Sequence, residues 1–204
     1  GSLPIITLVG GFTGMVTALQ SVNAFKLLKA EAYAGSAVGL SLAVELAPVL
    51  TALMLAGRAG AGIATELGTM RISEQIDALE TMAVSPIQYL VVPRVLAGAL
   101  MTPVLCLLFT FIGMVGCYLV AVVWMGVDPG QFMDKISRWI GPADFRQSLV
   151  KATVFGTMTI LIACQQGYSA SGGAAGVGQA TTRAVVLGSV MIMITDYFLT
   201  AAML

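Results

Sequence analysis

The chain has 204 residues, of which 58% are hydrophobic and 10% are charged, and its formal net charge is zero. Ordinary soluble domains carry about a quarter charged residues, so this chain has too few to cover a globular surface. We therefore expect an integral membrane protein, and the balanced charge gives no reason to expect a nucleic-acid partner.

Five apolar stretches are long enough to cross a bilayer as helices, which takes about 20 residues because lipid cannot satisfy free peptide groups. The expected fold is therefore all-α, a single polytopic transmembrane domain over residues 1–204. The five predicted spans cover about residues 3–25, 38–57, 95–125, 149–168 and 184–204.

The segments between the spans alternate between the two sides of the membrane. Residues 58–94 and 166–183 fall on one side, and residues 26–37 and 126–148 on the other. Basic residues usually mark the cytoplasmic side, but here they divide almost evenly, so charge alone does not orient the chain. The first side holds Arg58, Arg71, Arg94 and Arg183, and the second holds Lys26, Lys29, Lys135, Arg138 and Arg146.

The stretch VDPGQFMDKISRWIGP predicts a short helix on the second side. Asp128 is a good N-cap, Pro129 suits the first turn, and Gly141 followed by Pro142 predicts the end. Its apolar residues share one face, which favours a helix lying on the membrane surface. These residues are Phe132, Ile136 and Trp139.

Two glycine pairs have the spacing that lets membrane helices approach closely. They are Gly10-x-x-x-Gly14 and Gly35-x-x-x-Gly39. This spacing is compatible with a homodimer contact, although it is also common in membrane helices.

Residues 68–86, GTMRISEQIDALETMAVSP, concentrate charge between two apolar stretches. Their periodicity predicts a helix over 70–83, with Pro86 near its end. It is too short and too charged to span, so it is either a solvated loop helix or a helix that offers an acidic face to a partner. The predicted apolar stripe is Ile72, Ile76, Leu79 and Ala83, and the charged residues are Arg71, Glu74, Asp77 and Glu80.

The stretch GGAAGVGQATTR is close to a phosphate-binding P-loop but departs from it where it matters. Gln179 replaces the lysine that pairs with phosphate, and Ala180 replaces the Ser or Thr. We expect a flexible loop here, with Thr181 or Thr182 capping the last span. The chain is therefore not expected to be an enzyme or to hydrolyse ATP by itself.

Three ionisable residues fall inside predicted spans, where charge is costly and suggests function. At ~1.5 Å per residue, Glu45 lies roughly 10 Å and Asp196 roughly 12 Å from the same side, and Lys151 starts its span there. All three thus fall in the same half of the membrane. They would either line a polar site or form an ion-paired staple between helices.

The three cysteines, Cys106, Cys117 and Cys164, stand singly in apolar runs, which favours buried thiols. With no histidine and no CxxC spacing, we expect neither a metal site nor a redox site in this chain.

The long block ELAPVLTALMLAGRAGAGIATELGTMRISEQIDALETMAVSP (45–86), with ATTRAVV (180–186) and DYFLTAAM (196–203), resembles the MlaE family. This family comprises the permease subunits of MCE-type lipid ABC transporters. The resemblance implies that 70–83 is a coupling helix that docks into a cytoplasmic ATPase through Arg71, Glu74, Asp77 and Glu80. The amphipathic elbow helix that usually precedes the first span is not recognisable.

The resemblance further implies a homodimer in the bacterial inner membrane that moves phospholipids between inner and outer membranes and so contributes to outer-membrane lipid asymmetry. A STAS-domain subunit would accompany the ATPase, and an MCE-domain ring would stand on the extracytoplasmic side. No cofactor is expected in this chain, since ATP and Mg²⁺ would bind the partner ATPase. One stripe of the first span would contact acyl chains, unless it is ordinary packing: Met15, Leu19, Val22 and Phe25.

Other classes of protein remain open from the residues alone. An ion-coupled secondary transporter would use Glu45 and Asp196, but no inverted internal repeat is visible. A membrane-embedded enzyme would need a nucleophile beside a base, or metal ligands, and neither stands out. A structural membrane scaffold is less favoured because three charges lie within the spans.

Overall fold

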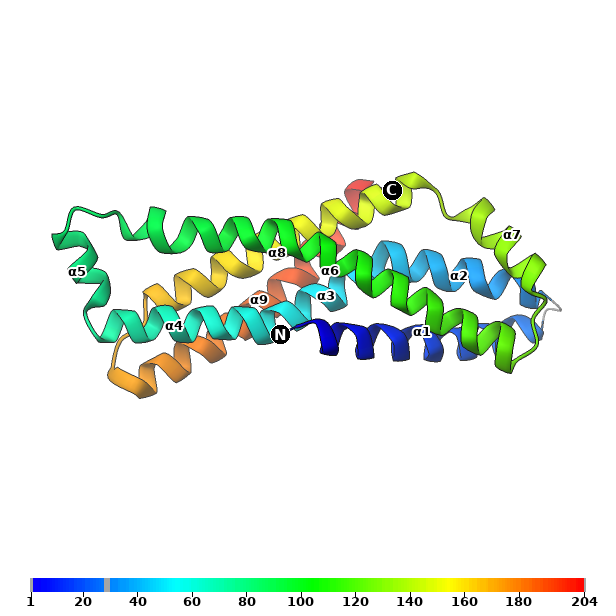
Figure 1. Ribbon diagram of the computed structural model, residues 1–204, viewed down its shortest axis with the longest axis horizontal. Helices are drawn as coiled ribbons and strands as arrows, with labels where there is room; N and C mark the ends of the chain where they lie inside the picture. The colour runs from blue at the N-terminus through cyan, green and yellow to red at the C-terminus, as the bar shows by residue number, and fades with distance from the viewer. Residues whose placement is uncertain (1, 28–29, 204) are drawn as a thin grey trace. The chain divides into compact units, whose positions relative to one another are not determined.

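The computed structural model describes residues 2–27 and 30–203 (Figure 1). Gly1, Leu28, Lys29 and Leu204 lie outside the described residues, so the expected placement of Lys29 is not addressed. All regular secondary structure in the described ranges is helical, which confirms the all-α fold.

Five helical stretches are long and apolar enough to cross a membrane, in agreement with the five predicted spans. Each is longer than predicted, because hydropathy detects only the apolar part of a helix that continues through small and polar residues. The largest extensions are at the end of the second stretch and the start of the last. The five stretches are Leu3–Lys26, Ala34–Ile72, Ile87–Trp124, Pro142–Tyr168 and Gly173–Met203.

Two of these stretches contain π-helical turns, at which one extra residue enters a turn and shifts every later side chain around the helix. A pattern read with a uniform 3.6-residue period therefore loses its register beyond such a turn. The second stretch consists of α2 (Ala34–Ser41), η2 (Leu42–Leu46), α3 (Ala47–Leu55), η3 (Ala56–Gly60) and α4 (Ala61–Ile72). The third consists of η4 (Ile87–Val91), α6 (Val92–Tyr118) and η5 (Leu119–Trp124).

The prediction of a flexible loop over 172–183 is wrong, because α9 (Gly173–Met203) already begins there. The Thr181 and Thr182 hydroxyls donate to the Val177 and Gly178 carbonyls one turn earlier, so neither caps the helix. Alanine is the strongest helix former, and this stretch is rich in it. The prediction of a loop gave too much weight to the glycines of this stretch and too little to its alanines.

By their contacts the residues divide into two compact units, and the single transmembrane domain stays a prediction. Unit 1 comprises Gly1–Thr51 and Val104–Val150, and unit 2 comprises Ala52–Pro103 and Lys151–Leu204. Each unit is described by itself below.

In unit 1, α1 (Leu3–Lys26) packs against α6 through glycine. A Cβ built on Gly14 would lie 1.9 Å from the Gly113 carbonyl oxygen, and one on Gly10 would lie 3.2 Å from the Phe109 carbonyl oxygen. The backbones therefore meet directly, as the spacing predicts. The predicted use of this face in a homodimer is wrong, because the same chain already covers it.

The second glycine pair is covered in the same way. A Cβ on Gly35 would lie 2.4 Å from the Phe132 ring, and one on Gly39 would lie 2.4 Å from the Ile140 side chain. This pair therefore mediates packing within unit 1 rather than a homodimer contact. The short helix that follows η5 packs against it.

That short helix is α7 (Pro129–Trp139), whose start and end agree with the prediction, while its position on the membrane surface stays a prediction. The Asp128 side chain accepts a hydrogen bond from the Gln131 backbone N–H at 2.8 Å, so the helix has its N-cap. The Phe132 ring is fully buried, against Gly35 and edge-on to Tyr118 at 5.9 Å between centroids. The helix turn η1 (Glu31–Tyr33) packs beside α7.

In unit 2, α4 packs along α9. Small buried residues make this approach possible, namely Ala64, Ala163 and Ala184, with Ile63 packed against them. The Thr65 and Thr181 hydroxyls, 2.8 Å apart, join the two helices. α8 (Pro142–Tyr168) closes the group, since a Cβ on its Gly167 would lie 2.8 Å from the Ala64 carbonyl oxygen.

Candidate functional site

The acidic segment after α4 forms two helices rather than the single helix predicted over 70–83. α4 ends at Ile72, and the short helix α5 begins only at Gln75 and ends at Thr81. Between them, the Ser73 hydroxyl donates to the Thr69 carbonyl, and Glu74 adopts a left-handed conformation with φ 59°. The left-handed conformation of Glu74 cannot continue a right-handed helix, so α4 and α5 are separate helices.

The predicted apolar stripe is therefore only partly realised. Ile76 is fully buried, whereas Ile72 is exposed, and Ala83 lies beyond α5 with φ 58°. Pro86 does not end the acidic helix but stands immediately before η4. α5 is thus held by one buried apolar side chain and needs other contacts to keep its position.

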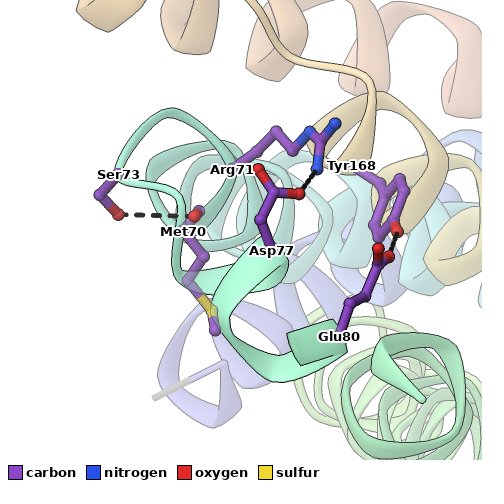
Figure 2. Close-up of polar contacts among 6 residues, drawn as sticks. All are labelled: Met70, Arg71, Ser73, Asp77, Glu80 and Tyr168. Carbon is purple, nitrogen blue, oxygen red and sulfur yellow. Dashed lines mark hydrogen bonds and ion pairs between the residues drawn. The ribbon is translucent and has the colours of Figure 1, made fainter. Parts of the chain in front are cut away.

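Those contacts are polar, and Figure 2 shows them. Arg71, near the end of α4, forms an ion pair with Asp77 of α5. The Arg71 guanidinium also lies over the Tyr168 ring, 5.7 Å from its centroid. The Tyr168 hydroxyl in turn donates to Glu80 Oε1 at 3.3 Å. Three of the four predicted charged residues are therefore joined around one tyrosine.

Glu74 differs from the other acids of the segment. Its carboxylate is exposed and makes no hydrogen bond or ion pair with the described part of the chain. It is therefore the acid most available to a partner, whereas Asp77 and Glu80 are shared with contacts inside the chain.

A second ion pair lies on the same connection. Arg94 Nη2 in α6 is 2.8 Å from Glu66 Oε1 in α4, and Arg94 Nη1 donates to the Leu90 carbonyl at 2.9 Å. This pair ties the two long helices that flank α5 in sequence (Figure 1).

The charges within the spans include one buried pair in unit 2. The Lys151 side chain of α8 is fully buried, and its Nζ lies 3.1 Å from Asp196 Oδ1 of α9. Lys151 Nζ also donates to Thr200 Oγ1 at 2.7 Å, and Thr200 donates to the Asp196 carbonyl. A buried ammonium needs such compensation, because an unpaired charge at this depth is strongly unfavourable.

Glu45 lies in η2 of unit 1 and is partly buried. The network of Glu45 with Lys151 and Asp196 therefore stays a prediction, while the pairing of Lys151 with Asp196 is present in unit 2.

The residues of α1 that were predicted to contact acyl chains differ in their exposure. Val22 is fully buried within unit 1, whereas Leu19 is exposed and Met15 is partly buried. Phe25 borders an open, mostly apolar pocket of about 290 Å³. The other residues that line this pocket are Tyr33, Ser36, Ala37, Leu40 and Trp139.

Tyr168, Thr200 and the pairing of Glu66 with Arg94 were not predicted from the sequence. Thr200 had a usable signal, because it lies one helical turn beyond Asp196 on the same face. Tyr168 had none, since 88 residues separate it from Glu80. The three cysteines are buried, as predicted. Among the described residues, no group of three or more Cys, Asp or Glu side chains is placed to hold a metal ion.

These features define the class of protein: an all-α polytopic membrane protein with a buried ion pair between two spans and an acidic helix at the turn between two others. The profile of the family described as Permease MlaE matches residues 1–202. The chain belongs to the MlaE permease family.

Individual relatives agree with this assignment. The chain is 45% identical over 199 residues to a "Probable ABC transporter permease protein" of Rickettsia felis, covering 98% of this chain and 77% of the relative. It is 42% identical over 203 residues to the "Intermembrane phospholipid transport system permease protein MlaE" of Haemophilus influenzae, covering 99% of this chain and 78% of the relative. It is also 38% identical over 200 residues to the chloroplastic protein TRIGALACTOSYLDIACYLGLYCEROL 1 of Arabidopsis thaliana, covering 98% of this chain and 57% of the relative.

Proposed function

We propose that this chain is the permease subunit of an ABC transporter that moves phospholipids between the inner and outer bacterial membranes. It would lie in the inner membrane as a homodimer, and a separate cytoplasmic ATPase would supply the energy. The printed name of the Haemophilus influenzae relative supports a phospholipid substrate, and membership of the MlaE permease family supports the subunit type.

The main structural support for this proposal is the helix α5. It is a short acidic helix at a turn between two spans, with one buried apolar side chain and most of its surface exposed. A helix of this kind gives a partner a defined shape to grip, and charged residues at its rim favour fast and specific docking. We propose that the ATPase docks on α5, with Glu74 as the acid that contacts it directly.

In this proposal, ATP and Mg²⁺ bind the ATPase and not this chain. Residues 173–183 belong to α9, and Gln179 stands where a P-loop would need lysine. A helical segment cannot wrap its backbone N–H groups around a phosphate as a glycine loop does. A STAS-domain subunit and an extracytoplasmic MCE-domain ring complete the proposed assembly.

For a phospholipid, the transport route would combine apolar surface for acyl chains with few polar groups. We propose that the Lys151–Asp196 pair supports this route, either by contact with the head group or by holding α8 against α9. Replacement of one member would leave a buried charge, which typically costs ~3–5 kcal/mol.

The test of docking is co-purification of the ATPase with the permease. Glu74→Lys should weaken co-purification, and the triple reversal of Glu74, Asp77 and Glu80 to lysine, which also breaks the contacts that hold α5, should abolish it. The matched control reverses Glu31 and Asp134, acids that lie on the other side in the predicted topology, and should leave it intact. An ATPase that stays bound to the triple variant would refute the role of α5.

The test of the polar pair is phospholipid transport in reconstituted vesicles. Lys151→Met, Asp196→Asn and Glu45→Gln are assayed separately, with folding checked by thermal unfolding. Reduced transport in a folded variant supports a polar site on the route. If all three transport normally, the charges serve only to pack helices.

A further inference from the structure

Tyr168 has contacts that the proposed function does not use. It is the last residue of α8, and its side chain reaches the acidic segment at two points (Figure 2). The hydroxyl donates to Glu80 Oε1, and the ring faces the Arg71 guanidinium. Its two interactions differ in kind, so a single substitution can remove one and keep the other.

These contacts restrain α5 at both of its ends. Asp77, in the first turn of α5, is paired to Arg71, and Glu80, near its last turn, is bonded to Tyr168. Residues three apart lie on one side of a helix. The same side of α5 is therefore fixed to α4 through Arg71 and to α8 through Tyr168.

Apolar packing alone would hold α5 weakly, because Ile76 is its one fully buried side chain. The polar contacts of Asp77 and Glu80 therefore determine which long helix moves with α5 when α5 is displaced. Arg71 connects it to α4, which already precedes it in the chain. Tyr168 adds a connection to a helix 88 residues away in sequence.

α8 continues without a break from Tyr168 back to Lys151. At ~1.5 Å per residue, these positions are about 25 Å apart along the helix. An α-helix of this length resists bending, so a shift at one end reaches the other. The far position carries the buried ammonium that pairs with Asp196.

We propose that Tyr168 is a positioning residue that couples α5 to α8, so that displacement of α5 moves the part of α8 that carries Lys151. The inference rests on the proposed function, since the force on α5 would come from the ATPase. It adds that the hydrogen bond from Tyr168 to Glu80 transmits this force, whereas the docking contact itself lies elsewhere on α5.

The central experiment compares phospholipid moved per ATP hydrolysed in vesicles that contain the full transporter complex. Tyr168→Phe removes the hydroxyl and keeps the ring against Arg71. We expect the ATPase to remain bound and ATP hydrolysis to continue, while phospholipid moved per ATP falls about 2- to 30-fold, the usual range for loss of one coupling contact. A purely structural role would instead lower assembly or thermal stability.

The matched control is Tyr89→Phe. Tyr89 is exposed, lies in the same unit, and its hydroxyl makes no hydrogen bond within the described residues. This variant should match the wild type. Glu80→Gln keeps an acceptor for the Tyr168 hydroxyl and should retain most coupling, whereas Glu80→Ala should reproduce the loss without disturbing any buried group.

The double variant Tyr168→Phe with Glu80→Ala tests whether the two residues act through one contact. If they do, it is no worse than either single variant, because the same bond cannot be lost twice. Additive losses would overturn the proposal.

Two further results would overturn it. One is an unchanged ratio of phospholipid to ATP in both Tyr168→Phe and Glu80→Ala. The other is loss of bound ATPase in Tyr168→Phe, which would make Tyr168 a docking residue. A failure of the proposed function is visible separately, because the wild-type complex itself would then bind no ATPase or move no phospholipid.

Discussion

Two short helices at turns between spans, α5 and α7, hold their positions in opposite ways. α7 has 11 residues, an N-cap at Asp128, a proline in its first turn and a buried aromatic anchor at Phe132. α5 has 7 residues, begins after a left-handed glutamate without a side-chain cap, and buries Ile76. α7 is specified by its own sequence, whereas α5 depends on partners elsewhere in unit 2.

The difference suggests a difference in use. A helix with a side-chain cap and a fully buried aromatic ring is held firmly against the helices it packs on. A helix held mainly by polar contacts to Arg71 and Tyr168 gains little stability from them, and its displacement is shared with the helix ends that carry these two residues. Elements that move in allosteric proteins are drawn from this weakly held class.

The largest effect is expected when the aromatic anchor of α7 is removed. Phe132→Ala empties the site against Gly35 and Tyr118 and should lower the free energy of unfolding by about 3–5 kcal/mol. Thermal unfolding of the purified permease in detergent measures the effect. Met133→Ala, at an exposed position of the same helix, is the control and should change little.

The corresponding change in α5 is Ile76→Ala. Loss of a fully buried isoleucine typically costs about 2–5 kcal/mol. We expect this loss to appear locally, as faster hydrogen exchange in peptides that contain α5, since few other contacts hold it. Hydrogen exchange that rises equally throughout unit 2 would show that α5 is part of the cooperative core and would contradict its description as a weakly held helix.

A smaller effect is expected at the cap of α7. Asp128→Ala removes the acceptor for the Gln131 N–H and should destabilise the permease by about 1 kcal/mol. Asp128→Asn keeps an acceptor oxygen and should behave almost as the wild type. Equal unfolding temperatures for Asp128→Ala and the wild type would contradict the assignment of this cap.

The smallest expected effect is a stabilisation, at the start of α5. Glu74→Gly should stabilise the start of α5 by about 0.5–1 kcal/mol, because glycine adopts φ 59° without the steric cost that a side chain adds. Thermal unfolding of the isolated permease measures this effect. A destabilised Glu74→Gly variant would mean that the glutamate side chain supports the turn.

The sequence predicted α7 well and α5 poorly, and the same contrast explains why. Asp128, Pro129 and Phe132 are local signals that a pattern can carry. The end of α4 depends on the left-handed backbone of Glu74, and the position of α5 depends on Tyr168, which no spacing rule connects to Glu80.

The polar residues of the spans were predictable to an intermediate degree. Counting depth from the ends of the spans placed Lys151 and Asp196 at similar levels, and they do form a pair. Depth alone does not say which faces of two helices meet. The π-helical turn η2 around Glu45 adds a register shift that no hydropathy pattern reveals.

The direct meeting of Gly14 with Gly113 has a practical consequence for anyone who labels this protein. A cysteine or a spin label at Gly14 would wedge the two backbones apart and report a distorted molecule, because its Cβ would lie 1.9 Å from the Gly113 carbonyl oxygen. Leu19, on the exposed side of α1, offers a site from which a probe would follow α1 without disturbing it.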